Sequence, residues 1–168
     1  MNEPRSHLLR IRLSRSAALA CALGAALGFS SGCSITEPSG RAAEAMDLSR
    51  NRQRWASANL HDYEFDYQLR CFCAPDATEP VHIVVRGDAI SSVVRSRDGL
   101  PAVTRFGGWP RVDELFATVQ RRLEQGAARV DVTYDVALGY PRSITVDIEL
   151  LTADDESEQV ASNLRAAR

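Results

Sequence analysis

Apolar and polar residues alternate strictly from Tyr63 onward, and this is the clearest periodic pattern in the chain. Apolar side chains at every second position through Cys73 predict a half-buried β-strand with one face in the core. The alternation resumes over residues 81–94 and is interrupted by Gly87 and Asp88, which suit a tight two-residue turn. Residues 81–94 are therefore predicted to form a β-hairpin.

A second pair of alternating segments lies nearer the C-terminus. Residues 130–134 and 144–150 alternate, and the turn-forming residues 135–141 separate them, so a second hairpin is predicted. The stretch from Gln159 has a weaker pattern. We interpret it as an edge strand, with a frayed helix as the alternative.

Two other segments carry the spacing of amphipathic helices. Apolar residues within 112–123 recur at intervals of three and four, and Gly126 follows where a helix commonly ends. The segment 47–60 predicts another helix, with an aspartate as N-cap at its first position and with Leu48 and Trp55 on one face.

These elements follow the order α-β-β-β-α-β-β, with one more strand if the C-terminal stretch pairs. Hairpins place strands antiparallel, and two helices can cover only one face of the resulting sheet. The expected fold class is α+β, with a single antiparallel sheet of five or six strands and two helices on one face. In the irregular loop 96–110, Phe106 and Trp109 either contribute to a binding surface or, for Trp109, pack beneath the following helix.

The N-terminus has the three-part pattern of a bacterial lipoprotein export signal. Arginines precede an apolar run at 17–29, and small residues then lead to Cys33. The apolar run is shorter than the roughly 20 residues of a membrane-spanning helix. Residues 1–32 are therefore expected to be a signal peptide, and Cys33 the lipid-modified N-terminus of the mature protein. Cleavage near Gly32 without lipid is the alternative, because Ser30 stands where such signals usually carry an aliphatic residue.

The signal divides the chain into three parts. Residues 33–46 are expected to tether residues 47–168, a single domain, to the membrane. The expected location is the cell envelope, with the protein anchored by lipid and facing the extracytoplasmic side. The formal net charge of −2 argues against nucleic acid as a partner, since nucleic-acid-binding domains concentrate basic charge.

Four segments of the expected domain form a recognisable combination. They are LHDYEFDYQLRCFC (60–73), VDELFATVQRRL (112–123), VTYDVALGYPRSITVD (132–147) and ADDE (153–156). The combination resembles an uncharacterised bacterial family of secreted and lipid-anchored proteins, domain-of-unknown-function family 6174, over roughly residues 47–163. The resemblance implies a shared fold and location but no activity.

Cys71 and Cys73 are the only pair of residues in the sequence whose spacing suggests a chemical reaction, namely thiol-disulfide exchange. Residues i and i+2 of an extended strand lie about 6.6 Å apart, near the limit of a disulfide, so closure requires a bend at the strand end. Such a disulfide would be more oxidising than a structural one, as a thiol-exchange protein requires. The alternation instead places both cysteines on the buried face, which favours packed core residues or a simple oxidised clip.

Acidic residues gather in two places. Those at positions 62, 64 and 66 share one strand face, where their spacing keeps them from converging on a calcium ion. They are expected to be solvated and paired with Arg70, Arg86 or Arg95. The loop residues at 153–156 can curl around an ion, although a solvated turn is favoured. The weak metal candidates are Asp154, Asp155 and Glu156.

Beyond the cysteine pair, the sequence offers no set of titratable groups with catalytic spacing, and neither His61 nor His82 has motif support. It therefore favours a non-enzymatic, lipid-anchored binding or accessory module without a cofactor. The expected partner is an envelope protein or a cell-wall component. The alternatives are a thiol-disulfide protein acting through Cys71 and Cys73 and, more weakly, a calcium-stabilised binding module.

Overall fold

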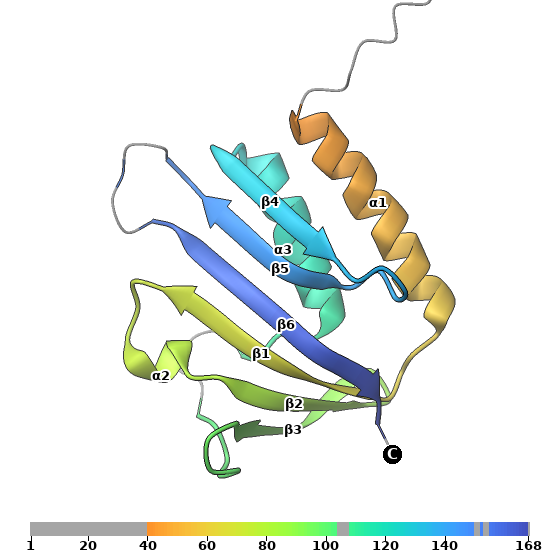
Figure 1. Cartoon of the computed structure of the whole chain (residues 1–168), viewed down its shortest axis with the longest axis vertical. Helices are drawn as coiled ribbons and strands as arrows, with labels where there is room; N and C mark the ends of the chain where they lie inside the picture. Colours follow the sequence, from red (N-terminus) through yellow and green to blue (C-terminus); the bar gives the residue numbers. More distant parts are fainter. Residues whose placement is uncertain (1–39, 104–107, 150–151, 153–154, 168) are drawn as a thin grey trace, which may run out of the picture. The chain divides into compact units, whose positions relative to one another are not determined.

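The computed structural model describes residues 40–103, 108–149, 152 and 155–167. Within them, one antiparallel sheet of six strands has the order β3-β2-β1-β6-β5-β4 (Figure 1). The predicted α+β fold class is confirmed. The strands are β1 (Tyr63–Cys71), β2 (Val81–Arg86), β3 (Ala89–Arg95), β4 (Arg129–Tyr134), β5 (Pro141–Asp147) and β6 (Ser157–Ala166), and the helices are α1 (Gly40–Ala58), α2 (Pro75–Thr78) and α3 (Val112–Gln125).

The alternation in the sequence becomes a buried face and an open face of the sheet. Tyr63, Phe65 and Tyr67 of β1 are buried, while the residues between them are partly exposed. Every second residue of β2, beginning at Val81, is fully buried in the same way. The core therefore lies on one side of the sheet, as alternation with one buried face requires.

Both predicted hairpins are confirmed. Gly87 and Asp88 join β2 to β3 with φ values of 51° and 62°, the left-handed conformations that a type I′ turn needs at both positions. In the second hairpin, Val132 of β4 pairs with Ile144 of β5. Strand β5 ends at Asp147, earlier than the alternation suggested.

Helices α1 and α3 cover the buried face, as predicted. Helix α3 packs against β4 and β5, and α1 packs against α3 and β4 (Figure 1). Gly126 ends α3 in the left-handed conformation, with φ 75°, so the predicted C-terminal glycine is confirmed. Helix α2 was not predicted. The fully buried stripe of α3 consists of Val112, Leu115, Phe116 and Val119.

Helix α1 begins at Gly40, whereas the sequence predicted its start at Asp47. Residues 40–46, which we assigned to the tether, are therefore helical. Their alanines, glutamate and methionine have high helix propensity, and two long-range contacts hold the early turns in place. Arg41 donates to the carbonyl of Ala127 over 3.2 Å, and the hydroxyl of Tyr134 donates to Glu44 over 3.3 Å.

Strand β6 corrects the prediction of an edge strand, because it lies between β1 and β5 in the middle of the sheet. Its pattern is weak because Ala161 is its one fully buried apolar residue among the described positions. Asn163 adopts φ 56°, and the ladder with β1 shifts register between Glu64 and Asp66. A bulge of this kind interrupts the two-residue period on which the prediction relied.

Trp109 is half-buried and packs against the core, with its ring edge-on to Tyr67 at a centroid distance of 6.4 Å. This favours packing near the start of α3 over a freely exposed loop anchor. Phe106, the other aromatic of that loop, lies outside the described residues.

Candidate functional site at the disulfide end of the sheet

Strand β1 leaves the sheet at Cys71, which forms a disulfide with Cys73. The two Cα atoms lie 5.2 Å apart, closer than the about 6.6 Å of an extended strand. The chain therefore bends between them, and the strand does not continue to Cys73 as the alternation suggested. We call residues 70–80, which contain the disulfide and α2, the disulfide segment.

The prediction that both cysteines face the core is wrong. Cys71 is half-buried, Cys73 is exposed, and the side chain of Phe72 between them is 82% exposed. The physical reason is the length of the neighbouring strand. The ladder between β1 and β2 ends where Tyr67 pairs with Val81, so beyond Tyr67 strand β1 keeps β6 as its neighbour on one side only. The alternation of the sequence continues past Tyr67. The elements that would bury these later residues, however, do not extend that far.

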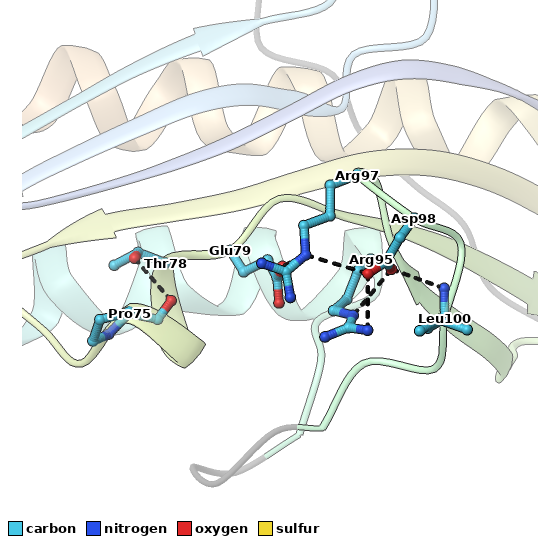
Figure 2. Close-up of polar contacts among 7 residues, drawn as sticks. All are labelled: Pro75, Thr78, Glu79, Arg95, Arg97, Asp98 and Leu100. Atoms are coloured by element: carbon cyan, nitrogen blue, oxygen red, sulfur yellow. Dashed lines mark hydrogen bonds and ion pairs between the residues drawn. The ribbon is translucent and has the colours of Figure 1, made fainter.

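Three hydrogen bonds fix the shape of the disulfide segment. The backbone N–H of Ala77 donates to the carbonyl of Ala74 over 2.9 Å, which closes the turn of α2. The Thr78 hydroxyl donates to the carbonyl of Pro75 over 3.1 Å (Figure 2). Gln68 Nε2 of β1 donates to the carbonyl of Thr78 over 3.1 Å and ties α2 back to the sheet.

A first groove, with a volume of about 690 Å³, lies on the β6 side of the disulfide segment. Arg70 and Glu158 form an ion pair in its wall, with 2.9 Å between Nη1 and Oε2. The hydroxyl of Ser143 also donates a hydrogen bond to Glu158. This hydrogen bond, followed by the one from Arg70, lowers the pKa of Glu158 below its usual value. The remaining lining residues are Cys71, Phe72, Thr145, Thr152, Glu156 and Ser157.

A second groove, of about 750 Å³, lies between the α2 side of the disulfide segment and the chain that follows β3. Figure 2 shows the ion-paired side chains beside it. Arg97 Nε lies 2.9 Å from Glu79 Oε1 and 3.3 Å from Asp98 Oδ2, and Arg95 Nη2 lies 2.9 Å from the same Asp98 oxygen. The N–H of Leu100 donates to Asp98 over 3.0 Å, and this hydrogen bond is the main reason that the pKa of Asp98 is lowered.

Both grooves carry apolar surface that is open to solvent. Phe72 lines the first groove, and Val103, which is 76% exposed, lines the second. Leu100, 54% exposed, follows the ion-paired Asp98. These exposed apolar side chains make the two grooves the candidate binding surfaces of the described part of the chain.

The open face of the sheet holds a separate polar cluster that sequence reasoning described incompletely. His82 Nδ1 lies 2.7 Å from Asp66, and His82 Nε2 lies 3.7 Å from Glu64. Asn163 Nδ2 donates to Asp66 over 2.7 Å, and Arg165 Nε lies 2.6 Å from Glu64. The predicted arginine partners were wrong in part, since Arg70 and Arg95 pair elsewhere. Asn163 and Arg165 could not be assigned without the central position of β6.

Burial alone would raise the pKa of Asp66, but hydrogen bonds from Asn163 and His82 outweigh it and lower that pKa. The two ring nitrogens of His82 face different carboxylates. This arrangement holds the ring between them, whereas a metal site needs its ligands to converge on one point. His61, the other predicted surface histidine, is exposed and lies 2.8 Å from Asp88.

The predicted metal candidates are not gathered into a site by the residues that the structure describes. Asp154 lies outside them. Asp155 Oδ2 accepts the N–H of Glu149 over 2.8 Å, its Oδ1 is buried without a hydrogen-bond partner, and Glu156 lines the first groove. No group of three or more histidine, cysteine or acidic side chains suited to a metal ion occurs in the described part of the chain. Cys33 also lies outside it.

The fold and the site together define a small α+β domain with one open sheet face and two grooves at one end of the sheet. Residues 47–166 match the family of unknown function DUF6174, and the chain belongs to that family. No curated protein and no solved structure matches the chain. Among the described helices, none is both long and apolar enough to cross a membrane.

Proposed function

We propose that the protein is a lipid-anchored component of the cell envelope that binds another envelope component through the disulfide end of its sheet. Anchoring through Cys33 is supported by the basic, apolar and small-residue succession that precedes this cysteine. Six residues separate Cys33 from Gly40, the first residue of α1. Fully extended, such a connection reaches about 25 Å.

Helix α1 begins at the same end of the sheet as the disulfide segment. Arg41, in the first turn of α1, donates to the carbonyl of Ala127, just before β4. Figure 1 shows the start of β4, the end of β5, the start of β6 and the end of β1 at this end of the sheet. A lipid on Cys33 would keep the start of α1 within the length of this connection from the membrane surface, and so within reach of other anchored molecules.

The observation that carries the binding proposal is that the disulfide segment lines both grooves and exposes Phe72 between them. A large aromatic side chain buries much area on contact with a partner at little entropic cost, which is why aromatics dominate binding energy at interfaces. Arg70 and Glu158, two charged groups of the groove that Phe72 lines, are already paired with each other. This supports recognition by shape and apolar contact over the acid-base chemistry of an enzyme.

Photo-crosslinking in intact envelopes tests the binding proposal. A photoreactive phenylalanine analogue at position 72 of the full-length protein should form an adduct with an envelope component. The matched control is the same analogue at Val136, which is 90% exposed in the turn between β4 and β5, at the opposite end of these strands.

The expected result is a discrete adduct from position 72 that is absent from position 136 and is weakened by Cys33→Ser. Equal labelling from both positions would contradict a binding surface at the disulfide end, and so would no adduct from position 72. Unchanged envelope retention of the Cys33→Ser variant would contradict lipid anchoring independently of the binding result.

A further inference from the structure

The Cys71–Cys73 disulfide contributes little to stability by the usual mechanism. A disulfide stabilises mainly by restricting the unfolded chain, and the effect grows with the length of the loop that it closes. Here the sequence separation is only 2. The bridge also lies outside the buried core, beyond Tyr67, where the pairing of β1 with β2 ends. Stabilisation of the fold therefore does not explain why this disulfide is present.

The position of this disulfide makes it accessible to an incoming thiol. Cys73 is exposed, and Phe72 beside it is 82% exposed. Cys71 and Phe72 line the first groove, so this groove opens beside the bridge. Thiol-disulfide exchange depends on access to the sulfur that is attacked, and exposed disulfides are the labile ones.

We propose that the Cys71–Cys73 disulfide exchanges with thiols of an extended, cysteine-bearing segment of an exported protein that lies in the first groove. A partner thiolate attacks Sγ of Cys73, which belongs to the more exposed of the two residues, so that a mixed disulfide forms and Cys71 leaves as a thiolate. A second partner thiolate then attacks the partner sulfur of the mixed disulfide and releases Cys73.

The exchange is balanced by the two partner thiols. They lose two protons and two electrons and become a disulfide, while the Cys71–Cys73 bridge gains the two electrons and takes up two protons from solvent. Each protein molecule oxidises one dithiol, so no further oxidant is needed for a single exchange. Phe72 provides an apolar contact for a side chain that flanks the partner cysteine.

The test uses the full-length chain with Cys21→Ser and Cys33→Ser, so that Cys71 and Cys73 are the remaining cysteines. The oxidised protein is mixed with a synthetic peptide that carries two cysteines flanked by leucine, and alkylation with mass spectrometry follows the appearance of protein thiols. The native protein should react within about tenfold of the rate of the same protein unfolded in urea, because the sulfur is already accessible. Phe72→Ser should slow the native reaction several-fold, and the matched Val136→Ser should not.

Reaction of the native protein more than about 100-fold slower than the unfolded protein would overturn the proposal, since it would show that the fold shields the bridge. A large fall in the thermal midpoint on reduction would also overturn it, because the disulfide would then be structural. The Cys71→Ser variant provides a second readout. Its free Cys73 should form a mixed disulfide with the oxidised peptide faster than the half-buried Cys71 of Cys73→Ser does. Failure of these purified-protein tests would leave the envelope-binding proposal untouched.

Discussion

The phenol oxygen of Tyr63 accepts a hydrogen bond from the backbone N–H of Val112 over 3.2 Å, and both residues are buried. Val112 is the first residue of α3, where the helix provides no acceptor for its N–H. Tyr63, the first residue of β1, therefore provides the acceptor for the N–H group at the start of α3, although the two residues are 49 positions apart in the sequence. Glu114 Oε2 accepts the N–H of Arg111 over 2.8 Å and completes the capping of this helix end.

Tyr63→Phe should destabilise the protein by about 1–3 kcal/mol, because it leaves a buried N–H without an acceptor while keeping the ring. Denaturant unfolding provides the measurement. Tyr134→Phe is the matched control, since the Tyr134 hydroxyl donates to Glu44. Glu44 is partly exposed, so water can take the place of the lost hydroxyl as its hydrogen-bond partner. An equal or larger loss in the control would contradict the capping role of Tyr63.

The buried stripe of α3 predicts a larger effect. Leu115→Ala or Phe116→Ala should each cost about 2–5 kcal/mol of unfolding free energy, because both side chains are 1% exposed and their removal leaves a cavity. Arg121→Ala, on the exposed side of the same helix, should stay within about 0.5 kcal/mol of the parent protein. If the core variants unfold at the same denaturant concentration as Arg121→Ala, then α3 does not pack on the sheet as described.

Gly139 brings the turn between β4 and β5 against α1. A Cβ atom at this position would lie 2.6 Å from the carbonyl oxygen of Asn51 and 3.0 Å from Cβ of Arg54, and φ is 78°. Gly139→Ala should therefore cost about 1–3 kcal/mol through overpacking, in addition to its backbone strain. Gly87→Ala is the control, since it also has positive φ but meets nothing within 4 Å. Thermal unfolding should rank Gly139→Ala clearly below Gly87→Ala, and the reverse order would refute the close approach.

The tyrosines predict how stability depends on alkaline pH. Burial raises the pKa of Tyr63 and of Tyr67 to about 12, and burial is also the main cause of the raised pKa of Tyr134 and Tyr140. An unfolded tyrosine ionises near pH 10, so the unfolded state loses protons first. Stability from these phenols is then complete below about pH 10 and is lost as pH rises towards about 12.

Ultraviolet titration should accordingly show little phenolate in the folded protein at pH about 10.5, although half or more of an unfolded control should have ionised. Tyr67→Phe should make the alkaline loss of stability less steep. Native tyrosines that titrate with the unfolded control would contradict their burial.

The parts of the fold that local patterns determine could be predicted from the sequence. The alternation from Tyr63 to Tyr67 predicts that one face of the strand is covered, and the apolar stripe that begins at Val112 predicts the same for one face of the helix. In the structure both faces are buried. Strand β6 could not be placed, because its position depends on distant pairing with β1 and β5 and its own period is broken near Asn163.

The candidate site was predictable only in part. The Cys71 and Cys73 pair is visible in the sequence, but its exposure is not, because alternation reports which face a residue takes and not how far the covering elements extend. The ion pair of Arg97 with Glu79 joins residues from two loops without a regular period. No sequence signal was available for such a contact.

We propose above all that the protein works in the cell envelope, held by a lipid on Cys33. The most direct test is mass spectrometry of the N-terminal peptide of the protein purified from its native host. The account predicts a mature chain that begins at Cys33 and carries the mass of a lipid on that residue. An unmodified N-terminus at or beyond Ser34, or a chain that retains residues 1–32, would contradict it.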